Sequence, residues 1–344
     1  MTMRLRAEWE QQDGVLLAWP HEATDWLPHL VPAQRTFAEI AAAISQSEHV
    51  VVVGPNQTSA LSAIYTANVV IDRVRFVELN TNDTWARDFG PITVSTPAGS
   101  PMILDFGFNG WGLKYAANHD NLVTRRLAAM KTFGTTPIKT VGLILEGGSL
   151  ETDGCGTLLT TSECLLNANR NPHLTKGELE RELNKWFGID HFLWLDHGAL
   201  TGDDTDSHID TLARLCPDDT IVYVRCDDPQ DEQYAGLQAM EQQLSSFRTK
   251  QGGRFRLISV PTPTAKRNDD GRRLPATYAN FLIINDAVLV PTYADEGDEE
   301  AIFAITKAFP GRRVVGIDCN SLILQYGSLH CVTMQLPQGV LAGK

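Results

Sequence analysis

One thiol, one imidazole and three carboxylates are the side chains best suited to chemistry, although they lie far apart in the sequence: Cys331, His208, Asp88, Glu146 and Asp210. A guanidinium group is planar, permanently charged and rich in N–H donors. Two carboxylates could hold its plane bidentately, which leaves its central carbon open to a thiolate. A histidine could then protonate the departing ammonia and later activate water. A cysteine protease has no need of several carboxylates, so this set indicates attack on a cationic carbon.

Asp88 lies in the segment 82–91, which also carries Trp85 and Arg87. One interpretation is a surface ion pair between Arg87 and Asp88 beside a packed tryptophan. The other is a binding site with an aromatic wall and a carboxylate. The second is favoured because loops commonly carry functional residues.

The segment 195–210 holds five aspartates and two histidines within sixteen residues. Metal binding is one interpretation, but His208 and Asp210 lack the spacing of helical zinc sites. A general acid–base histidine beside carboxylates that hold a cation is the second, and a solvated acidic loop is the third. If Ile209 points into a sheet, His208 and Asp210 lie on the same face of a strand.

The stretch 143–151 is echoed by 322–330, and Cys331 follows the second copy. Each copy is expected to run from an apolar strand through a tight glycine turn into a second strand. Two such turns aimed at one point would bring Glu146 and Cys331 together, and the base for this thiol would come from elsewhere in the fold. Similarity at long spacing is typical of repeat architectures, although two unrelated hairpins could share these residues.

The elements that must position these residues are short helices and strands. Helical periodicity predicts helices at 32–47, 120–131, 175–187, 230–247 and 298–309, with Thr175 and Glu178 in a capping box and Asp298 capping the last helix. Strands are predicted at 50–53, 76–79, 138–145, 157–160, 220–224, 255–260, 281–284, 287–290 and 313–317. Asn285 and Asp286 read as a tight hairpin turn.

This alternation predicts an α/β fold built as a ring of repeated mixed modules, closed so that no sheet edge is left over. An open doubly wound sheet would have longer apolar strands and fewer hairpins. No long linker interrupts the chain, so a single domain over residues 1–344 is expected.

The composition fits an acidic globular protein. The 344 residues are 43% hydrophobic and carry a formal net charge of −13, which disfavours nucleic acid and anionic membranes as partners and suits a small cationic substrate. The N-terminal residues show no signal-peptide pattern, and no apolar stretch has the length of a membrane span. Six cysteines without a Cys-x-x-Cys pair fit reduced thiols in the cytoplasm. The sequence leaves a homo-oligomer open.

Eight segments, spread over nearly the whole chain, together carry a resemblance to a known family: AWP at 18–20, WARDFGP at 85–91, FNGWG at 108–112, EGGS at 146–149, LLNANRNP at 165–172, TDSHID at 205–210, YANF at 278–281 and HCVT at 330–333. The chain resembles the bacterial-type peptidylarginine-deiminase family of the guanidine-modifying superfamily, and within it the agmatine deiminases.

The resemblance implies a pseudosymmetric five-module α/β propeller with one central site and no metal or organic cofactor. Cys331 would be the nucleophile and His208 the acid–base group, with Glu146 beside His208 to raise the pKa of the imidazole. Asp88 and Asp210 would grip the guanidinium. Further substrate contacts are expected from Trp85, Trp111, Asp204 and Asn280. On agmatine, hydrolysis through a cysteine-bound amidino intermediate would release N-carbamoylputrescine and ammonia.

One segment departs from the family pattern. Members commonly carry a glycine run and an asparagine just before the His-Cys pair, whereas this chain has Tyr-Gly-Ser-Leu at 326–329. The contacts of this loop, and the outer shape of the pocket, are therefore open.

The choice among guanidines depends on charges near the site. Lys114 is the only basic residue in the loop 107–117, whereas Asp203, Asp204 and Asp206 lie in the acidic segment and could hold a distal amine. This favours agmatine over arginine, whose carboxylate would be repelled. Three alternatives remain: deimination of peptidyl-arginine or another guanidine, a non-catalytic propeller that binds polyamines, and a metal-dependent hydrolase.

Overall fold

The computed structural model describes residues 3–341 and shows a mixed α/β fold whose strands form five separate sheets. The first two sheets contain β1 (Arg4–Leu5), β5 (Ile92–Ser95), β6 (Pro101–Gly107) and β7 (Ile138–Ile144), then β10 (His191–Leu195), β9 (Thr157–Thr161) and β8 (Glu151–Thr152). The next two contain β11 (Ala213–Cys216), β12 (Thr220–Arg225) and β13 (Arg256–Pro261), then β14 (Leu282–Ile283), β15 (Ala287–Thr292) and β16 (Arg313–Asp318). The last contains β17 (Thr333–Pro337), β2 (Gln12–Ala18), β3 (His49–Gly54) and β4 (Val74–Glu78).

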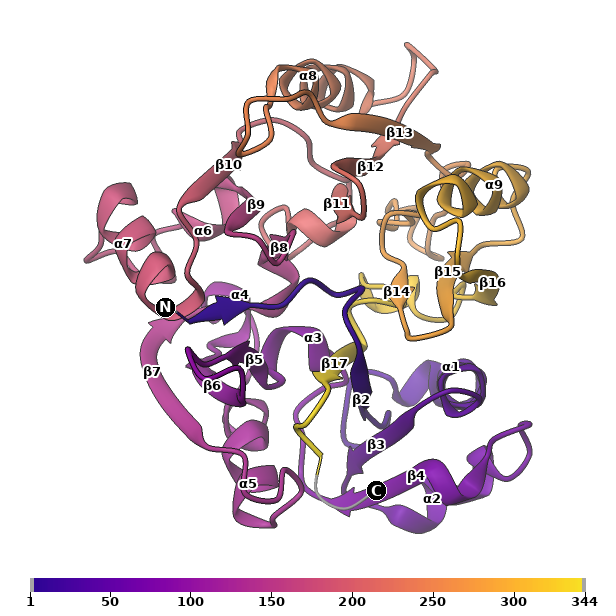
Figure 1. Ribbon diagram of the computed structural model, residues 1–344. Helices are drawn as coiled ribbons and strands as arrows, with labels where there is room; N and C mark the ends of the chain where they lie inside the picture. The colour runs from indigo at the N-terminus through magenta and orange to yellow at the C-terminus, as the bar shows by residue number, and fades with distance from the viewer. Residues whose placement is uncertain (1–2, 342–344) are drawn as a thin grey trace.

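The same connection recurs in every sheet. An antiparallel pair shares a strand with a parallel pair, and the parallel strands are joined through a helix, as a parallel connection requires. The connecting helices are α1 (Leu30–Ser45), α5 (Val123–Ala129), α7 (Lys176–Phe187), α8 (Tyr234–Ser246) and α9 (Asp298–Ala308). They are the five helices that the sequence predicts. Figure 1 shows them on the outer side of the molecule, with the sheets nearer its middle.

Local sequence signals explain these helices. The predicted apolar face of α1 is buried, and it comprises Phe37, Ile40, Ala41 and Ile44. The capping box of Thr175 and Glu178 is confirmed at the start of α7. The shorter helices are α2 (Gln57–Ile64), α3 (Ala86–Phe89), α4 (Gly110–Leu113) and α6 (Ser162–Leu165). Between residues 3 and 341, no helix has the length and apolar character needed to cross a bilayer.

Several helix starts and one cap differ from the prediction. Helix α1 begins at Leu30 rather than at residue 32, and α5 begins at Val123, after the 3-10 turn Asp120–Leu122, rather than at residue 120. Helix α8 begins at Tyr234 rather than at residue 230. Gly297, not Asp298, is the N-cap of α9. The Asp298 carboxylate instead accepts hydrogen bonds from the backbone N–H groups of Tyr293 and Asp295 at 3.0 and 3.1 Å, so it orders the loop that leads into the helix.

The echoed segment is only partly as predicted. Residues 143–144 end strand β7, but residues 322–324 form no strand, and Ile323–Gln325 is a 3-10 turn. Their backbone N–H groups bond locally, for example from Leu322 to the carbonyl oxygen of Cys319 at 2.9 Å. This apolar run is buried without joining a sheet, which periodicity alone could not distinguish from a strand. The expectation that no sheet edge is left over also fails, because each of the five described sheets has two edge strands.

The antiparallel part of each sheet is entered through a short turn. Helix α3 precedes β5, the 3-10 turns Gly147–Ser149 and Ile209–Thr211 precede β8 and β11, and non-helical turns precede β14 and β17. Figure 1 shows α3, β8, β11, β14 and β17 around the middle of the molecule. The five residues proposed for chemistry, with Trp85 and Asn280, lie in or next to these five turns, so the repeated module brings distant parts of the chain to one place. Trp111 lies instead in α4, and Asp204 in the loop that leads to the turn Ile209–Thr211.

Candidate active site

The five residues proposed for chemistry form one buried cluster. None of them has more than 4% of its surface exposed: Cys331, His208, Asp88, Glu146 and Asp210. The strand predicted for His208 and Asp210 is wrong, because His208 precedes the 3-10 turn Ile209–Thr211 and Asp210 lies within it. The tight turn still delivers both side chains to the cluster.

The thiol of Cys331 lies among polar groups. Its Sγ atom is 3.8 Å from Oδ2 of Asp210 and accepts a hydrogen bond from the Asn280 side-chain amide at 3.2 Å. The amide oxygen of Asn280 accepts from the backbone N–H of Cys331 at 3.2 Å, which fixes the turn. Burial, together with the charges of Asp210 and Asp88, raises the pKa of the Cys331 thiol well above its ordinary value. The thiol is therefore protonated in the free protein.

Asp210 is an ionised carboxylate with one oxygen still available. Its Oδ2 atom is 2.7 Å from Nδ1 of His330, and both side chains are fully buried. Burial alone would raise the pKa of Asp210, but the hydrogen bond and charge of His330, with help from His208 and Arg214, hold it below its ordinary value. Its Oδ1 atom is buried and has no hydrogen-bond partner among the described residues.

Asp88 is held less firmly in its charged form. Its two oxygens accept hydrogen bonds from the indole N–H of Trp111 at 2.9 Å and from the backbone N–H of Gly148 at 3.0 Å. Burial raises the pKa of Asp88 to about 6; His208 opposes this shift, and the charge of Asp210 adds to it. The two carboxyl groups therefore differ in pKa, because that of Asp88 is raised to about 6 whereas that of Asp210 lies below its ordinary value.

His208 lies between two acids. Its Nδ1 atom is 3.6 Å from Asp88, and its Nε2 atom is 3.8 Å from Glu146, so neither contact is a hydrogen bond. Burial alone would lower the pKa of His208, but Asp88, Cys164 and Glu146 outweigh it and raise the pKa well above its ordinary value. The direction agrees with the prediction, although Asp88 contributes more than Glu146. The imidazole is a cation that can act as an acid.

Glu146 is fixed by an arginine that the sequence argument did not single out. The Arg170 Nε atom donates to both of its carboxylate oxygens, at 3.1 and 2.8 Å, and both side chains are completely buried. Arg170 and His208 hold the pKa of Glu146 below its ordinary value against the effect of burial. The arginine lies in the segment 165–172 on which the family resemblance depends, so a signal for it was present.

A narrow pocket leads to the thiol, and its walls are acidic and aromatic. The lining residues that carry charge or a ring are Asp25, Asp83, Asp88, Asp203, Asp204, Trp85, Trp111, Tyr115 and Tyr326, beside Cys331. No lysine or arginine is among the described residues that line it. Such a cavity favours a ligand that is a cation along much of its length.

Fewer carboxylates of the acidic segment near the cavity are free to bind a distal amine than the sequence predicts. Asp206 is occupied, because it pairs with Lys114 at 2.7 Å and with Arg170 at 2.6 Å. Asp203 accepts from the backbone of Ser207 at 2.8 Å and so orders its own loop. Asp204 accepts one hydrogen bond from the Tyr115 hydroxyl at 2.8 Å, and burial raises its pKa. Asp204 is thus the acid of this run best placed to hold a distal amine.

The interpretation of Arg87 and Asp88 as a surface pair is wrong. Each is only 4% exposed, and Arg87 instead pairs with Glu8 at 2.8 Å. Trp85 lines the cavity next to Gly327, where an added Cβ would lie 2.2 Å from the indole ring. The unusual loop 326–329 therefore needs its glycine for the close approach of Trp85.

Two groups of side chains have the atom types of a metal site. Glu146, Cys164 and His208 lie within 4.8 Å of one another, as do Glu8, Glu151 and His330. In each group a carboxylate already neutralises a buried guanidinium, which competes with a metal ion for its charge. Of these six residues, sequence reasoning gave roles only to Glu146 and His208. His330 lies in the HCVT segment that carries the resemblance, so a signal for it was present, whereas Glu8, Glu151 and Cys164 have no local spacing that would have identified them.

Comparison with known proteins places the chain in a family. Residues 4–337 match the model of the Porphyromonas-type peptidyl-arginine deiminase family. A Yersinia pestis protein provisionally named agmatine deiminase is 35% identical, over 96% of this chain and 94% of that protein. A Porphyromonas gingivalis structure provisionally named arginine deiminase is 48% identical, with a TM-score of 0.94 and coverage of 99% and 100%.

A third relative was solved with its substrate bound. It is the C. jejuni agmatine deiminase in a cysteine-to-serine form, 39% identical, with a TM-score of 0.91 and coverage of 98% of this chain and 97% of that chain. The buried thiol, imidazole and carboxylates described above suit the chemistry that these names share. The chain belongs to the Porphyromonas-type peptidyl-arginine deiminase family, and it is a hydrolase that acts on guanidino carbon–nitrogen bonds.

Proposed function

We propose that this protein hydrolyses agmatine to N-carbamoylputrescine and ammonia. The observation that carries the proposal is the cavity that reaches Cys331 between acidic and aromatic walls, with no cationic side chain on its described lining. Agmatine has a guanidinium at one end and an amine at the other, so both ends suit such walls. We further propose that the five sheets form one catalytic five-module propeller around this site.

The guanidinium is expected to lie between Asp88 and Asp210, against Trp85. The free Oδ1 atom of Asp210 supplies an acceptor for its N–H groups. Trp111 and Asn280 act indirectly, because Trp111 orients Asp88 and Asn280 donates to the sulfur of Cys331. A distal amine would lie toward Asp204.

Binding of the cation prepares the nucleophile. The raised pKa of Cys331 is caused by burial and by two negative charges, and a guanidinium between those charges offsets them. The thiol then loses its proton more readily, and this proton passes to solvent through the pocket that reaches Cys331. The thiolate attacks the guanidinium carbon to form a C–S bond. His208 donates a proton to the amino group that leaves as ammonia, and an amidino-thioether remains on Cys331.

Water completes the reaction. His208, now neutral, accepts a proton from water as the water oxygen bonds to the amidino carbon. The C–S bond then breaks, which releases the urea-type product and returns the thiol. Glu146 and Arg170 hold the far side of the imidazole and keep its electrostatic surroundings fixed.

Replacement of Cys331 tests the nucleophile. Cys331→Ser should reduce ammonia release from agmatine to background, because a serine hydroxyl is far less acidic than a thiol. The variant should keep the melting temperature of the parent, since serine occupies a similar volume. Cys155→Ser, at an exposed cysteine, is the matched control. Full activity of Cys331→Ser would contradict the mechanism.

Gly148→Ala tests the geometry of the cluster. An added Cβ would lie 2.6 Å from Nδ1 of His208 and 2.9 Å from Asp88. We expect kcat to fall by about a hundredfold, because a displacement of about 1 Å at a reacting group has that effect. Gly142→Ala is the control, since an added Cβ there meets nothing within 4 Å. Equal kcat values for the two variants would show that His208 need not keep its position.

The pH dependence of kcat/KM should show an acid limb near the pKa of Asp88. Because burial raises that pKa to about 6, acidification below pH 6 removes a charge that binds the guanidinium, so kcat/KM falls. Asp88→Asn should remove this limb and lower kcat/KM at neutral pH by about 30-fold or more, since one partner of a buried charge pair is lost. A parent profile that stays flat from pH 8 to pH 5 would exclude this role for Asp88.

A substrate series tests the proposed specificity. The values of kcat/KM should decrease from agmatine to a guanidine with an uncharged tail and then to arginine, whose carboxylate meets the acidic wall. A partly solvated distal ion pair should contribute about 1 kcal/mol, which is roughly a fivefold preference over the uncharged tail. Peptidyl-arginine as the best substrate would transfer the protein to protein citrullination. Activity that a chelator abolishes would favour a metal-dependent hydrolase.

A further inference from the structure

Three side chains in contact, Asp210, His330 and Glu8, connect the candidate active site with the N-terminal segment. Asp210 accepts a hydrogen bond at 2.7 Å from Nδ1 of His330, and Nε2 of the same imidazole lies 2.9 and 3.0 Å from the two carboxylate oxygens of Glu8. Asp210 and His330 are fully buried, and the Glu8 side chain is 17% exposed. Glu8 lies between β1 and β2, so the N-terminal segment reaches within two side chains of the guanidinium-binding carboxylate.

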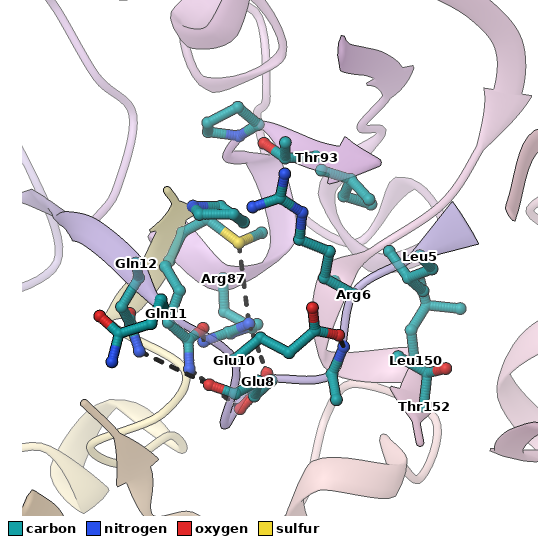
Figure 2. A pocket seen from close by; sticks show the side chains of 17 residues that line it. Leu5, Arg6, Glu8, Glu10, Gln11, Gln12, Arg87, Thr93, Leu150 and Thr152 are labelled. Carbon is teal, nitrogen blue, oxygen red and sulfur yellow. Dashed lines mark hydrogen bonds and ion pairs between the residues drawn. The ribbon is translucent and has the colours of Figure 1, made fainter. Parts of the chain in front are cut away.

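Glu8 cannot touch a substrate in the cavity described above. It lines a separate cavity, together with Arg87 and Glu10, and it is not among the residues that line the cavity of Cys331. Figure 2 shows Glu8 in this separate cavity, with dashed contacts from its carboxylate to neighbouring side chains. Glu8 can therefore act on the reaction only through the groups that it contacts. Among these, His330 is the one whose side chain hydrogen-bonds to a candidate site residue, Asp210.

The position of Glu8 is fixed by several charged contacts. Its carboxylate pairs with Arg87 at 2.8 Å and with Arg214 at 2.7 Å, and it accepts from the Gln335 amide at 3.0 Å. Arg214 is fully buried, pairs with Glu151, and lies with its guanidinium carbon 4.5 Å from the centre of the Phe281 ring. Charged groups held this way have little freedom to move, so Glu8, together with Arg214 at 3.1 Å from the same Nε2 atom, gives His330 a fixed orientation.

The orientation of His330 matters because, within the described part of the chain, the Asp210 carboxylate has only one other side-chain hydrogen bond, the long contact of 3.8 Å with Sγ of Cys331. Its Oδ2 atom bonds to His330, and its Oδ1 atom has no partner. An imidazole that rotated away would leave this carboxylate buried, unpaired and free to turn. Asp88, by contrast, is held by both Trp111 and Gly148.

We propose that Glu8 is a positioning residue for Asp210 and acts through His330, so that the N-terminal segment helps to set the affinity for the guanidinium. The role of Asp210 as a guanidinium ligand rests on the proposed function. Glu8 performs no bond-making step. It keeps one imidazole turned so that Nδ1–H points at Asp210.

Steady-state kinetics on agmatine test this proposal with a matched control. Glu8→Gln keeps the shape of the side chain but removes its charge, and KM should rise about tenfold while kcat changes less than about threefold, as expected for one weakened hydrogen bond to a charged group. Glu10→Gln is the control, because Glu10 lines the same cavity but pairs with Arg4 rather than His330. A KM for Glu8→Gln equal to that of the control would overturn the proposal.

Two replacements of His330 separate its contact at Nδ1, with Asp210, from its contacts at Nε2, with Glu8 and, at 3.1 Å, with Arg214. The side-chain amide nitrogen of asparagine takes the place of Nδ1 and can still donate to Asp210, whereas that of glutamine takes the place of Nε2 and can donate only toward Glu8. His330→Gln should therefore raise KM more than His330→Asn. In the Glu8→Gln, His330→Gln double variant, KM should equal that of His330→Gln alone. Independent, multiplying effects would show that Glu8 acts by another route. If Glu8→Gln does not fold, the order of the two His330 variants decides the matter.

Alkylation of Cys331 distinguishes failure of this proposal from failure of the proposed function. Chloroacetamidine is an electrophile that carries the charge of a guanidinium, and iodoacetamide is neutral. The ratio of their rates at the Cys331 peptide, followed by mass spectrometry, reports on the carboxylates without any turnover. The ratio should fall about tenfold in Glu8→Gln and stay at the parent value in Glu10→Gln. If the parent hydrolyses no guanidine, the proposed function fails. If the ratio does not change in Glu8→Gln, the positioning role fails.

Discussion

The mutual repulsion of buried carboxylates is the constraint on which this structure depends. Asp88, Glu146 and Asp210 are enclosed around one thiol, where a low dielectric makes each negative charge costly unless a partner balances it. The three carboxylates have partners that differ in charge and in distance. Glu146 has the buried guanidinium of Arg170, and Asp210 has an imidazole backed by further charges, whereas Asp88 has only dipolar donors and a more distant imidazole. That inequality explains why one acid of the proposed pair titrates near neutrality and the other does not.

The repeated module brings residues from five distant parts of the sequence to one site. Each sheet joins its parallel strands through an outer helix, and each begins its antiparallel pair with a turn near the middle of the molecule. In every module, one part therefore stabilises the fold and another carries the residues of the candidate site. The outer helices bury apolar faces, while the turns contribute one or two polar side chains each. Those polar side chains need the neighbouring modules for their partners.

The sequence predicted the parts that depend on local pattern. The five connecting helices follow from periodicity and capping residues, and the residues of the proposed site follow from short motifs. It misplaced His208 and Asp210 on a strand, because a 3-10 turn and a strand can both carry alternating buried polar residues. It overestimated how many carboxylates of the acidic segment are free to bind a ligand, because the partners of Asp206 come from elsewhere in the chain. It missed Glu8 entirely, since the pair that Glu8 forms with Arg214 spans 206 positions and leaves no spacing to detect.

The pairing of β17 with β2 determines how late during synthesis on the ribosome the candidate site can be completed. Strand β2 is made early, but its antiparallel neighbour is the last strand of the protein and follows directly after Cys331. Closing a loop of such length is entropically unfavourable until the intervening modules have compacted. Cys331, the proposed nucleophile, is therefore made only after the other residues of the candidate site. A chain that ends before residue 331 lacks this sulfur, so under the proposed mechanism it would consume no guanidine.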